Sequence, residues 1–197
     1  MFFSVSIHRV SCCVPYGNGK VSGTEMTVLV TGGSKCGKSH FAESLFNDLE
    51  GEKVYIVTMQ PYGEEAFAAI ERHRKMRSGK GFETIEKYTD IGSVDVPEGC
   101  GVLLECMGNL CANEMFCGEE MTCPADKIID GIKQLKSRTK LLVIVTNEVG
   151  SDGIPYAEGT AEYIREMGEI NRRTAELSDL VVECVYGIPV PLKGTIE

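Results

Sequence analysis

A glycine-rich segment, "GGSKCGKS" at residues 32–39, has the residue types and spacing of a phosphate-binding loop. Four residues separate Gly32 from the Gly37–Ser39 triplet, which is the Walker A pattern. Glycines let successive backbone N–H groups point at phosphate oxygens, and the following helix directs the positive end of its dipole at the same anion. Lys38 would reach the β- and γ-phosphates as a catalytic residue, and the Ser39 hydroxyl would bind Mg²⁺. The predicted phosphate-binding residues are Gly32, Gly33, Ser34, Lys35, Cys36, Gly37, Lys38 and Ser39.

A triphosphate site also needs an acidic side chain at the end of another buried strand, close to the magnesium. The apolar run "GVLLEC" at residues 101–106 places Glu105 at such a strand end. We therefore predict Ser39 and Glu105 as the metal ligands, with Mg²⁺ offsetting the charge that develops in triphosphate chemistry. The alternative is that Glu105 caps a neighbouring helix.

A second candidate for chemistry is His73, which lies in the basic stretch "AAIERHRKMRSGK" at residues 68–80. The chain has a formal net charge of −9, yet this stretch gathers Arg72, Arg74, Lys75, Arg77 and Lys80 around the histidine. Nearby positive charge disfavours the imidazolium form and leaves a neutral, nucleophilic ring. The same cations would neutralise charge on a phosphate under attack. This arrangement suits covalent transfer of a phosphoryl or nucleotidyl group through histidine, whereas the alternative is a solvated basic helix face.

The elements that must position these residues alternate along the chain between apolar, β-branched runs and amphipathic runs. Continuous apolar runs are typical of parallel strands that are covered on both faces. The pattern predicts an α/β fold, with a mostly parallel sheet flanked by helices. Strands are predicted at residues 27–31, 53–58, 82–88, 101–106, 141–150 and 180–187, and helices at residues 39–49, 64–76 and 159–177.

Composition and length indicate one ordinary globular domain. The chain has 197 residues, of which 43% are hydrophobic and 25% are charged. Its acidic balance argues against nucleic acid as a partner, and no apolar run approaches the roughly 18–20 residues of a membrane span. Residues 1–25 are rich in Pro, Gly, Asn and Ser, whereas Met26 stands directly before the first predicted strand. We expect residues 1–25 to be a disordered or non-native leader and residues 26–197 to form a single domain.

The nine cysteines form no CxxC pair, and the four between residues 106 and 123 are spaced by five to six residues. Tetrahedral zinc sites usually take their ligands as close pairs, so this spacing does not favour one. We interpret the cysteines as reduced thiols, which predicts a cytoplasmic protein.

The motifs occur in the order typical of one family. "VLVTGGSKCGKSHFAE", "RHRKMR…FETIE", "LLEC", "VTNEVGSDGIP" and "GEINRRTAELSDLVVECVYGIPVPLKG" together resemble the bifunctional adenosylcobinamide kinase / adenosylcobinamide-phosphate guanylyltransferases of cobalamin biosynthesis. The resemblance covers residues 26–194. It implies a P-loop nucleotide-binding, RecA-like fold assembled as a trimer. It also implies two reactions: phosphorylation of adenosylcobinamide by ATP or GTP, then transfer of GMP from GTP through a guanylyl-histidine, giving adenosylcobinamide-GDP.

The resemblance also assigns roles to individual residues. His73 is the histidine in the matching segment, so it would carry the GMP. Two acidic positions, Glu86 and Glu105, would hold the guanine nucleotide or its metal; acids can accept from the guanine N1–H and amino groups. The remaining implied nucleotide contacts are Thr58, Met59, Gln60, Arg74, Lys75, Met76 and Arg77.

The chain departs from the family pattern at several positions. Ser78 and Phe82 replace a usual Pro and Trp, and Ala161 and Arg165 replace a usual Arg and Asp. The segment after Glu105 loses the usual Leu-Thr beginning. Two alternatives therefore stay open: a P-loop kinase without guanylyl transfer, and a nucleotide-binding regulatory module.

Overall fold

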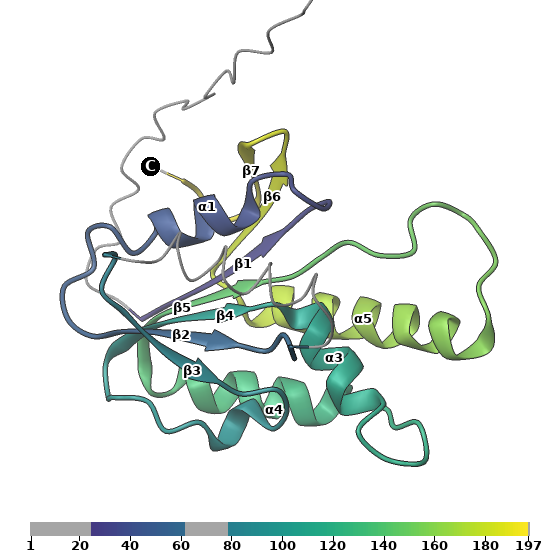
Figure 1. Ribbon diagram of the computed structural model, residues 1–197. Coiled ribbons are helices and arrows are strands. Elements are labelled where there is room, and N and C mark those ends of the chain that lie inside the picture. Colours follow the sequence, from purple (N-terminus) through teal and green to yellow (C-terminus); the bar gives the residue numbers. More distant parts are fainter. Residues whose placement is uncertain (1–24, 62–78, 197) are drawn as a thin grey trace, which may run out of the picture.

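The computed structural model describes residues 25–61 and 79–196, and in these ranges a seven-stranded sheet forms the centre of the molecule (Figure 1). Its strand order is β3-β2-β4-β5-β1-β6-β7, and every pairing is parallel except that of β6 with β7. The predicted mostly parallel sheet is confirmed. The strands are β1 (Met26–Thr31), β2 (Lys53–Val57), β3 (Phe82–Glu86), β4 (Cys100–Glu105), β5 (Thr139–Val145), β6 (Leu180–Val185) and β7 (Ile188–Lys193).

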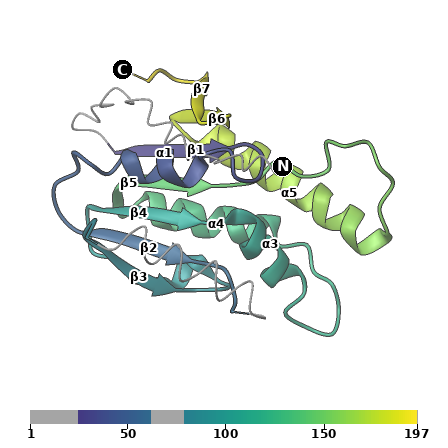
Figure 2. The same cartoon turned by 45° about the horizontal axis from the view of Figure 1, so that its top comes forward.

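Helices cover both faces of this sheet (Figures 1 and 2). One face carries α1 (Lys38–Ser44), and the other carries α3 (Met107–Met115), α4 (Ala125–Lys136) and α5 (Glu158–Leu177). A short 3₁₀ turn, Ile91–Ser93, packs against α4. No helix in the two described ranges combines the length and apolar character that crossing a membrane requires.

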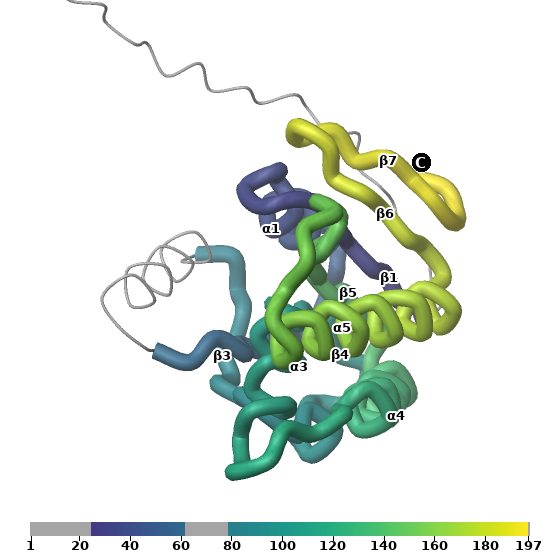
Figure 3. The backbone as a smooth tube through the Cα atoms, turned by 90° about the vertical axis from the view of Figure 1, so that its right-hand side faces the viewer, coloured from purple at the N-terminus to yellow at the C-terminus, as the bar shows by residue number. Residues whose placement is uncertain are grey.

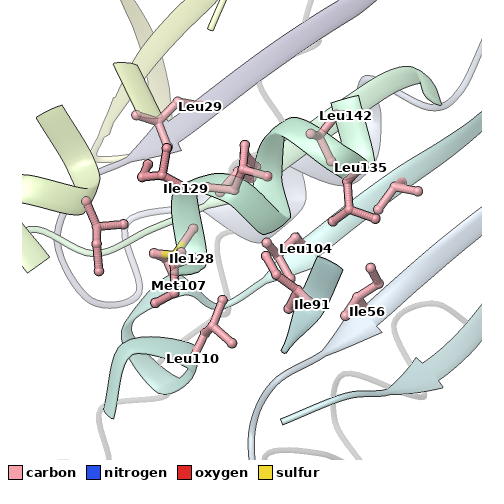
Figure 4. Packing of buried hydrophobic residues seen from close by; sticks show 14 of the residues in the cluster. Leu29, Ile56, Ile91, Leu104, Met107, Leu110, Ile128, Ile129, Leu135 and Leu142 are labelled. Atoms are coloured by element: carbon pink, nitrogen blue, oxygen red, sulfur yellow. The ribbon is translucent and has the colours of Figure 1, made fainter. Parts of the chain in front are cut away.

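Alternation along the strands decides which side chains face which helices. Leu104 of β4 packs with Met107, Ile128 and Leu110 beneath the sheet (Figure 4). Its neighbour Leu103 points to the opposite face, in the cluster that contains Phe41 of α1. Glu105 follows Leu103 by two residues, so its carboxylate points to the same face of the sheet, on which α1 lies.

The observed boundaries differ from the predicted ones where the chain turns. Helix α1 ends at Ser44 instead of residue 49, and the next residues form turns closed by bonds such as Phe46 N–H to Glu43 O. The apolar side chains that suggested a longer helix, among them Phe46 and Leu49, still pack into the core. Strand β5 covers residues 139–145, where 141–150 was predicted. The predicted helix 64–76 and residues 1–24 lie outside the described residues.

The last predicted strand, residues 180–187, corresponds to β6, and a further strand that the sequence analysis did not predict follows it. Strand β6 ends at Val185, and a two-residue turn, Tyr186–Gly187, leads into the antiparallel edge strand β7. Val185 lies directly opposite Ile188 across this turn, so the backbone N–H of Ile188 points toward β6. Along β7 the N–H groups then point alternately away from β6 and toward it. Pro189 and Pro191 therefore occupy the positions whose N–H would point to the open edge, where proline is tolerated.

Candidate active site

The predicted site residues of the described part gather at one edge of the sheet. The phosphate-binding loop follows β1, Thr58 follows β2, Glu86 ends β3 and Glu105 ends β4. Since these strands are parallel, their carboxyl ends meet at the same edge. Val57 pairs in register with Glu86 on one side and Glu105 on the other. The two acids are thus separated by two strand spacings, roughly 10 Å between their Cα atoms.

The loop itself depends on backbone conformations that favour glycine. Gly32 has φ 133° and Gly37 has φ 101°. A Cβ on Gly32 would lie only 2.6 Å from the backbone oxygen of Cys184 on β6, so no side chain fits there. The loop folds around Lys38, whose Nζ donates to the carbonyl oxygens of Gly32 (2.9 Å) and Gly33 (2.6 Å). This lysine is 7% exposed, and its ammonium is thereby held within the loop.

Ser39 and Glu105 meet beside this lysine. The Ser39 hydroxyl donates to Oε1 of Glu105, although the two residues are 66 positions apart in the sequence. The other carboxylate oxygen, Oε2, accepts a 2.7 Å bond from the hydroxyl of Tyr55 on β2. Glu105 is 9% exposed, and the bond from Tyr55 fixes its orientation. A hydroxyl next to a carboxylate is an oxygen donor set of the kind that Mg²⁺ takes from proteins.

Thr58 holds the ends of β2 and β4 together. Its hydroxyl donates to the backbone oxygen of Cys106 and accepts from the backbone N–H of the same residue, both at 2.8 Å. Asn113 of α3 donates to the carbonyl oxygens of Thr58 (2.8 Å) and Tyr88 (2.9 Å). Burial raises the pKa of the Cys106 thiol, which favours a structural over a nucleophilic role for it. Thr58 thus acts mainly as a strand clamp in this structure.

Glu86 lies at the exposed side of the same edge, where Met59 and Gln60 are partly exposed. Its Oε2 accepts a 2.8 Å bond from the hydroxyl of Tyr88. Desolvation, followed by this bond to the carboxylate, raises the pKa of Tyr88. Tyr88 therefore stays a donor at neutral pH, and Glu86 is presented to solvent as an acceptor.

The residues of the basic segment that carry the predicted covalent chemistry, His73, Arg74, Lys75, Met76 and Arg77, lie outside the described residues. Lys80, from the end of that segment, is described, and it forms an ion pair with Glu43 of α1. Glu43 is 2% exposed, and its Oε1 has no hydrogen-bond partner among the described residues. The chain leaving the basic segment is thus tied to the helix that begins at Lys38.

Three side chains at the site were not found from the sequence. Tyr55 and Glu43 are described above. The third, Asn171 of α5, accepts from the Thr146 hydroxyl (2.7 Å) and donates to the Asn147 carbonyl (3.3 Å), so it holds the "TNEVG" strand end. Each contact joins elements distant in the sequence. The order of the strands, which would place Tyr55 next to Glu105, is not visible in the sequence.

We predict that replacing Tyr55 by phenylalanine raises the Mg²⁺ concentration that catalysis requires, without unfolding the protein. The ring stays in place, but Glu105 loses a donor that orients it, and such losses typically reduce metal affinity or activity by about 10- to 100-fold. The measurement is the Mg²⁺ concentration giving half-maximal phosphoryl transfer. Tyr88→Phe, which removes the equivalent bond to Glu86, is the matched control and should leave that concentration unchanged. An unaltered Mg²⁺ requirement in Tyr55→Phe would contradict the assignment of Glu105.

Comparisons with known proteins identify the family of this chain. The family model described as cobinamide kinase / cobinamide phosphate guanyltransferase matches residues 28–192. The chain is 32% identical over 184 residues to the bifunctional adenosylcobalamin biosynthesis protein CobU of Salmonella typhimurium, covering 85% of this chain and all of that protein. It is 29% identical over 187 residues to CobU of Escherichia coli, with the same coverage of 85% and 100%.

Among solved structures, the flagellar accessory protein FlaH of Methanocaldococcus jannaschii is similar with a TM-score of 0.45 and 14% identity, over 88% of this chain and 83% of that chain. The family match extends from within β1 to within β7, and so includes the loop, Glu105 and the "TNEVG" strand end. The family expected from the sequence is confirmed: this chain belongs to the cobinamide kinase / cobinamide phosphate guanyltransferase family.

Proposed function

We propose that the protein phosphorylates adenosylcobinamide and then transfers GMP from GTP to the new phosphate, giving adenosylcobinamide-GDP. The observation that carries this proposal is the convergence of Lys38, Ser39 and Glu105 at one sheet edge, in a chain that matches the family model over most of its length. ATP and GTP are the proposed nucleotide substrates, and adenosylcobinamide is the proposed acceptor.

In the proposed first reaction, the terminal hydroxyl oxygen of the aminopropanol arm bonds to the γ-phosphorus of the nucleotide. The bond from that phosphorus to the bridging oxygen breaks, and the hydroxyl proton is released. Lys38 exchanges the carbonyls of its own loop for phosphate oxygens. Ser39 and Glu105 would hold Mg²⁺, whose charge offsets the charge that develops on the phosphates. Tyr55 keeps the carboxylate in position.

In the proposed second reaction, a ring nitrogen of His73 bonds to the α-phosphorus of GTP, and pyrophosphate leaves. The corrinoid phosphate then displaces the histidine from GMP. Arg74, Lys75, Met76 and Arg77 would contact this nucleotide, as would Met59 and Gln60, whereas Thr58 would hold the strand ends beside it. Glu86 supports the assignment of guanine, because its exposed carboxylate can accept from the N1–H and the amino group.

We expect α-labelled GTP to leave acid-labile, alkali-stable label on the wild-type protein and none on His73→Asn. The label reports the phosphorus–nitrogen bond to histidine, which asparagine does not form. His8→Asn, in the predicted leader, is the matched control and should be labelled like the wild type. If the wild type takes up no label while still phosphorylating adenosylcobinamide, the protein is a kinase without guanylyl transfer.

The first reaction distinguishes the proposed enzyme from the alternative, a nucleotide-binding regulatory module. A protein that binds nucleotide but forms no adenosylcobinamide phosphate with either ATP or GTP would be a binding module. Three further points remain predictions: trimeric assembly, cytoplasmic location, and the division of the chain into a leader and one domain over residues 26–197. Sedimentation tests the assembly, and truncation at Met26 tests the division.

A further inference from the structure

The tip of the β6–β7 hairpin lies against the phosphate-binding loop. The backbone N–H of Gly187 donates to the carbonyl oxygen of Cys36 at 2.9 Å. A Cβ on Gly37 would approach the Cα of Gly187 to 3.2 Å, so the two backbones are nearly in contact. Figures 1 and 3 show the hairpin next to the segment that joins β1 to α1. A residue at this tip is therefore placed beside anything bound in the loop.

Tyr186 occupies that tip in a conformation that its own side chain disfavours. It has φ 51° and Gly187 has φ 84°, both in the left-handed region, as a type I′ turn requires. Asparagine, aspartate or glycine is preferred at the first of these positions, and a bulky residue there is an outlier. The Tyr186 side chain is also 96% exposed, so burial in the described part of the chain does not stabilise it. Neither turn geometry nor packing among the described residues accounts for an aromatic ring here.

The direction of a bound triphosphate follows from the strand order. Ser39 contacts Glu105 of β4, which lies on the β5 side of β1. A metal and the γ-phosphate held by these residues would thus lie on that side. The hairpin, which β6 and β7 form, lies on the other side of β1. A nucleotide with its γ-phosphate near Glu105 would extend its nucleoside toward the hairpin tip.

We propose that the ring of Tyr186 is a stacking platform for the base of the nucleotide bound in the phosphate-binding loop. The proposal rests on the phosphoryl-donor nucleotide of the first reaction described under Proposed function and adds a residue that contacts its base, whereas Glu86 is proposed for the GTP of the second reaction. Every base has a π-face, so stacking is tolerant of base identity. The platform would therefore support adenine and guanine nucleotides alike and would not itself select between them.

The test is the affinity of Tyr186→Asn for two probes, measured by calorimetry with Mg²⁺: a non-hydrolysable ATP analogue and inorganic tripolyphosphate. Asparagine suits the first position of a type I′ turn, so this variant removes the ring without disturbing the hairpin. Loss of one base-stacking contact, taken as about 1–3 kcal/mol, predicts an affinity for the analogue that is weaker by about 5- to 150-fold. Affinity for tripolyphosphate, which has no base, should stay within about 2-fold. Tyr186→Phe keeps the ring and should bind the analogue like the wild type.

Three results would overturn the proposal. The first is an unchanged affinity of Tyr186→Asn for the ATP analogue. The second is an equal loss of analogue and tripolyphosphate binding, which would show that the variant disturbs the loop. The third is a changed sedimentation behaviour with unaltered analogue affinity, which would make Tyr186 a contact between copies of the chain. Failure of the wild type to bind either probe would instead refute the nucleotide site itself.

Discussion

Lys38→Ala should lower the rate of phosphoryl transfer to adenosylcobinamide by about 10²- to 10³-fold, the range measured when one preorganised donor to developing charge is removed. The ammonium of Lys38 lies within the loop, bonded to the carbonyls of Gly32 and Gly33, and is almost completely shielded from solvent. A charge held in such a position interacts with phosphate far more strongly than a charge in water does. The measurement is the rate of adenosylcobinamide phosphate formation at saturating nucleotide.

Lys35→Ala is the control for this prediction. Lys35 lies in the same loop, where its predicted phosphate contact comes from the backbone N–H that alanine keeps, and its charged side chain is exposed. Exposed charges are screened by water and salt, so its loss should change the rate by about 3-fold or less. If Lys38→Ala keeps the wild-type rate, or if Lys35→Ala is as slow as Lys38→Ala, the phosphates do not bind where we place them.

Gly32→Ala should reduce the free energy of unfolding by about 3 kcal/mol, combining backbone strain with overpacking. Gly32 has φ 133°, a region that side chains rarely adopt, and its added Cβ would come within 2.6 Å of the Cys184 carbonyl oxygen and 3.0 Å of the Cys36 sulfur. The carbonyl belongs to strand β6 and cannot move without disturbing the sheet. Urea denaturation, with the slope compared between variants, measures the effect.

Gly33→Ala separates this clash from a general effect of losing glycine. Apart from its chain neighbours, no atom of the described residues lies within 4 Å of a Cβ built on Gly33, and its φ is not in the left-handed region. Its stability should therefore change by less than about 1 kcal/mol. Equal stabilities of the two alanine variants would mean that the loop relaxes away from β6.

The parts of the site that could be predicted from the sequence are those encoded by short spacing. The loop at residues 32–39 and the acid at the end of an apolar run follow from local pattern, and the structure brings Ser39 and Glu105 together. Tyr55 could not be predicted in the same way. Its bond to Glu105 requires β2 and β4 to be neighbours, which depends on how the crossovers fold and not on any local signal.

The fold shows the same division. Apolar runs predicted the core strands, but helix α1 stops at Ser44 although its apolar periodicity continues to Leu49, because turn residues can bury the same side chains. Helix α4 had a usable signal, since Ile128, Ile132 and Leu135 recur on one helical face and are buried. Strand β7 had none, because two prolines in six residues argue against a strand unless it lies at an edge.

Those prolines have a consequence for how the protein behaves at high concentration. An outermost strand with free donors is a template on which another chain can add its own strand, and this is a common route to aggregation. Pro189 and Pro191 leave the outer side of β7 without two of the donors that such an addition would need. Copies of the protein that meet along this border should therefore remain separate instead of growing into a continuous intermolecular sheet.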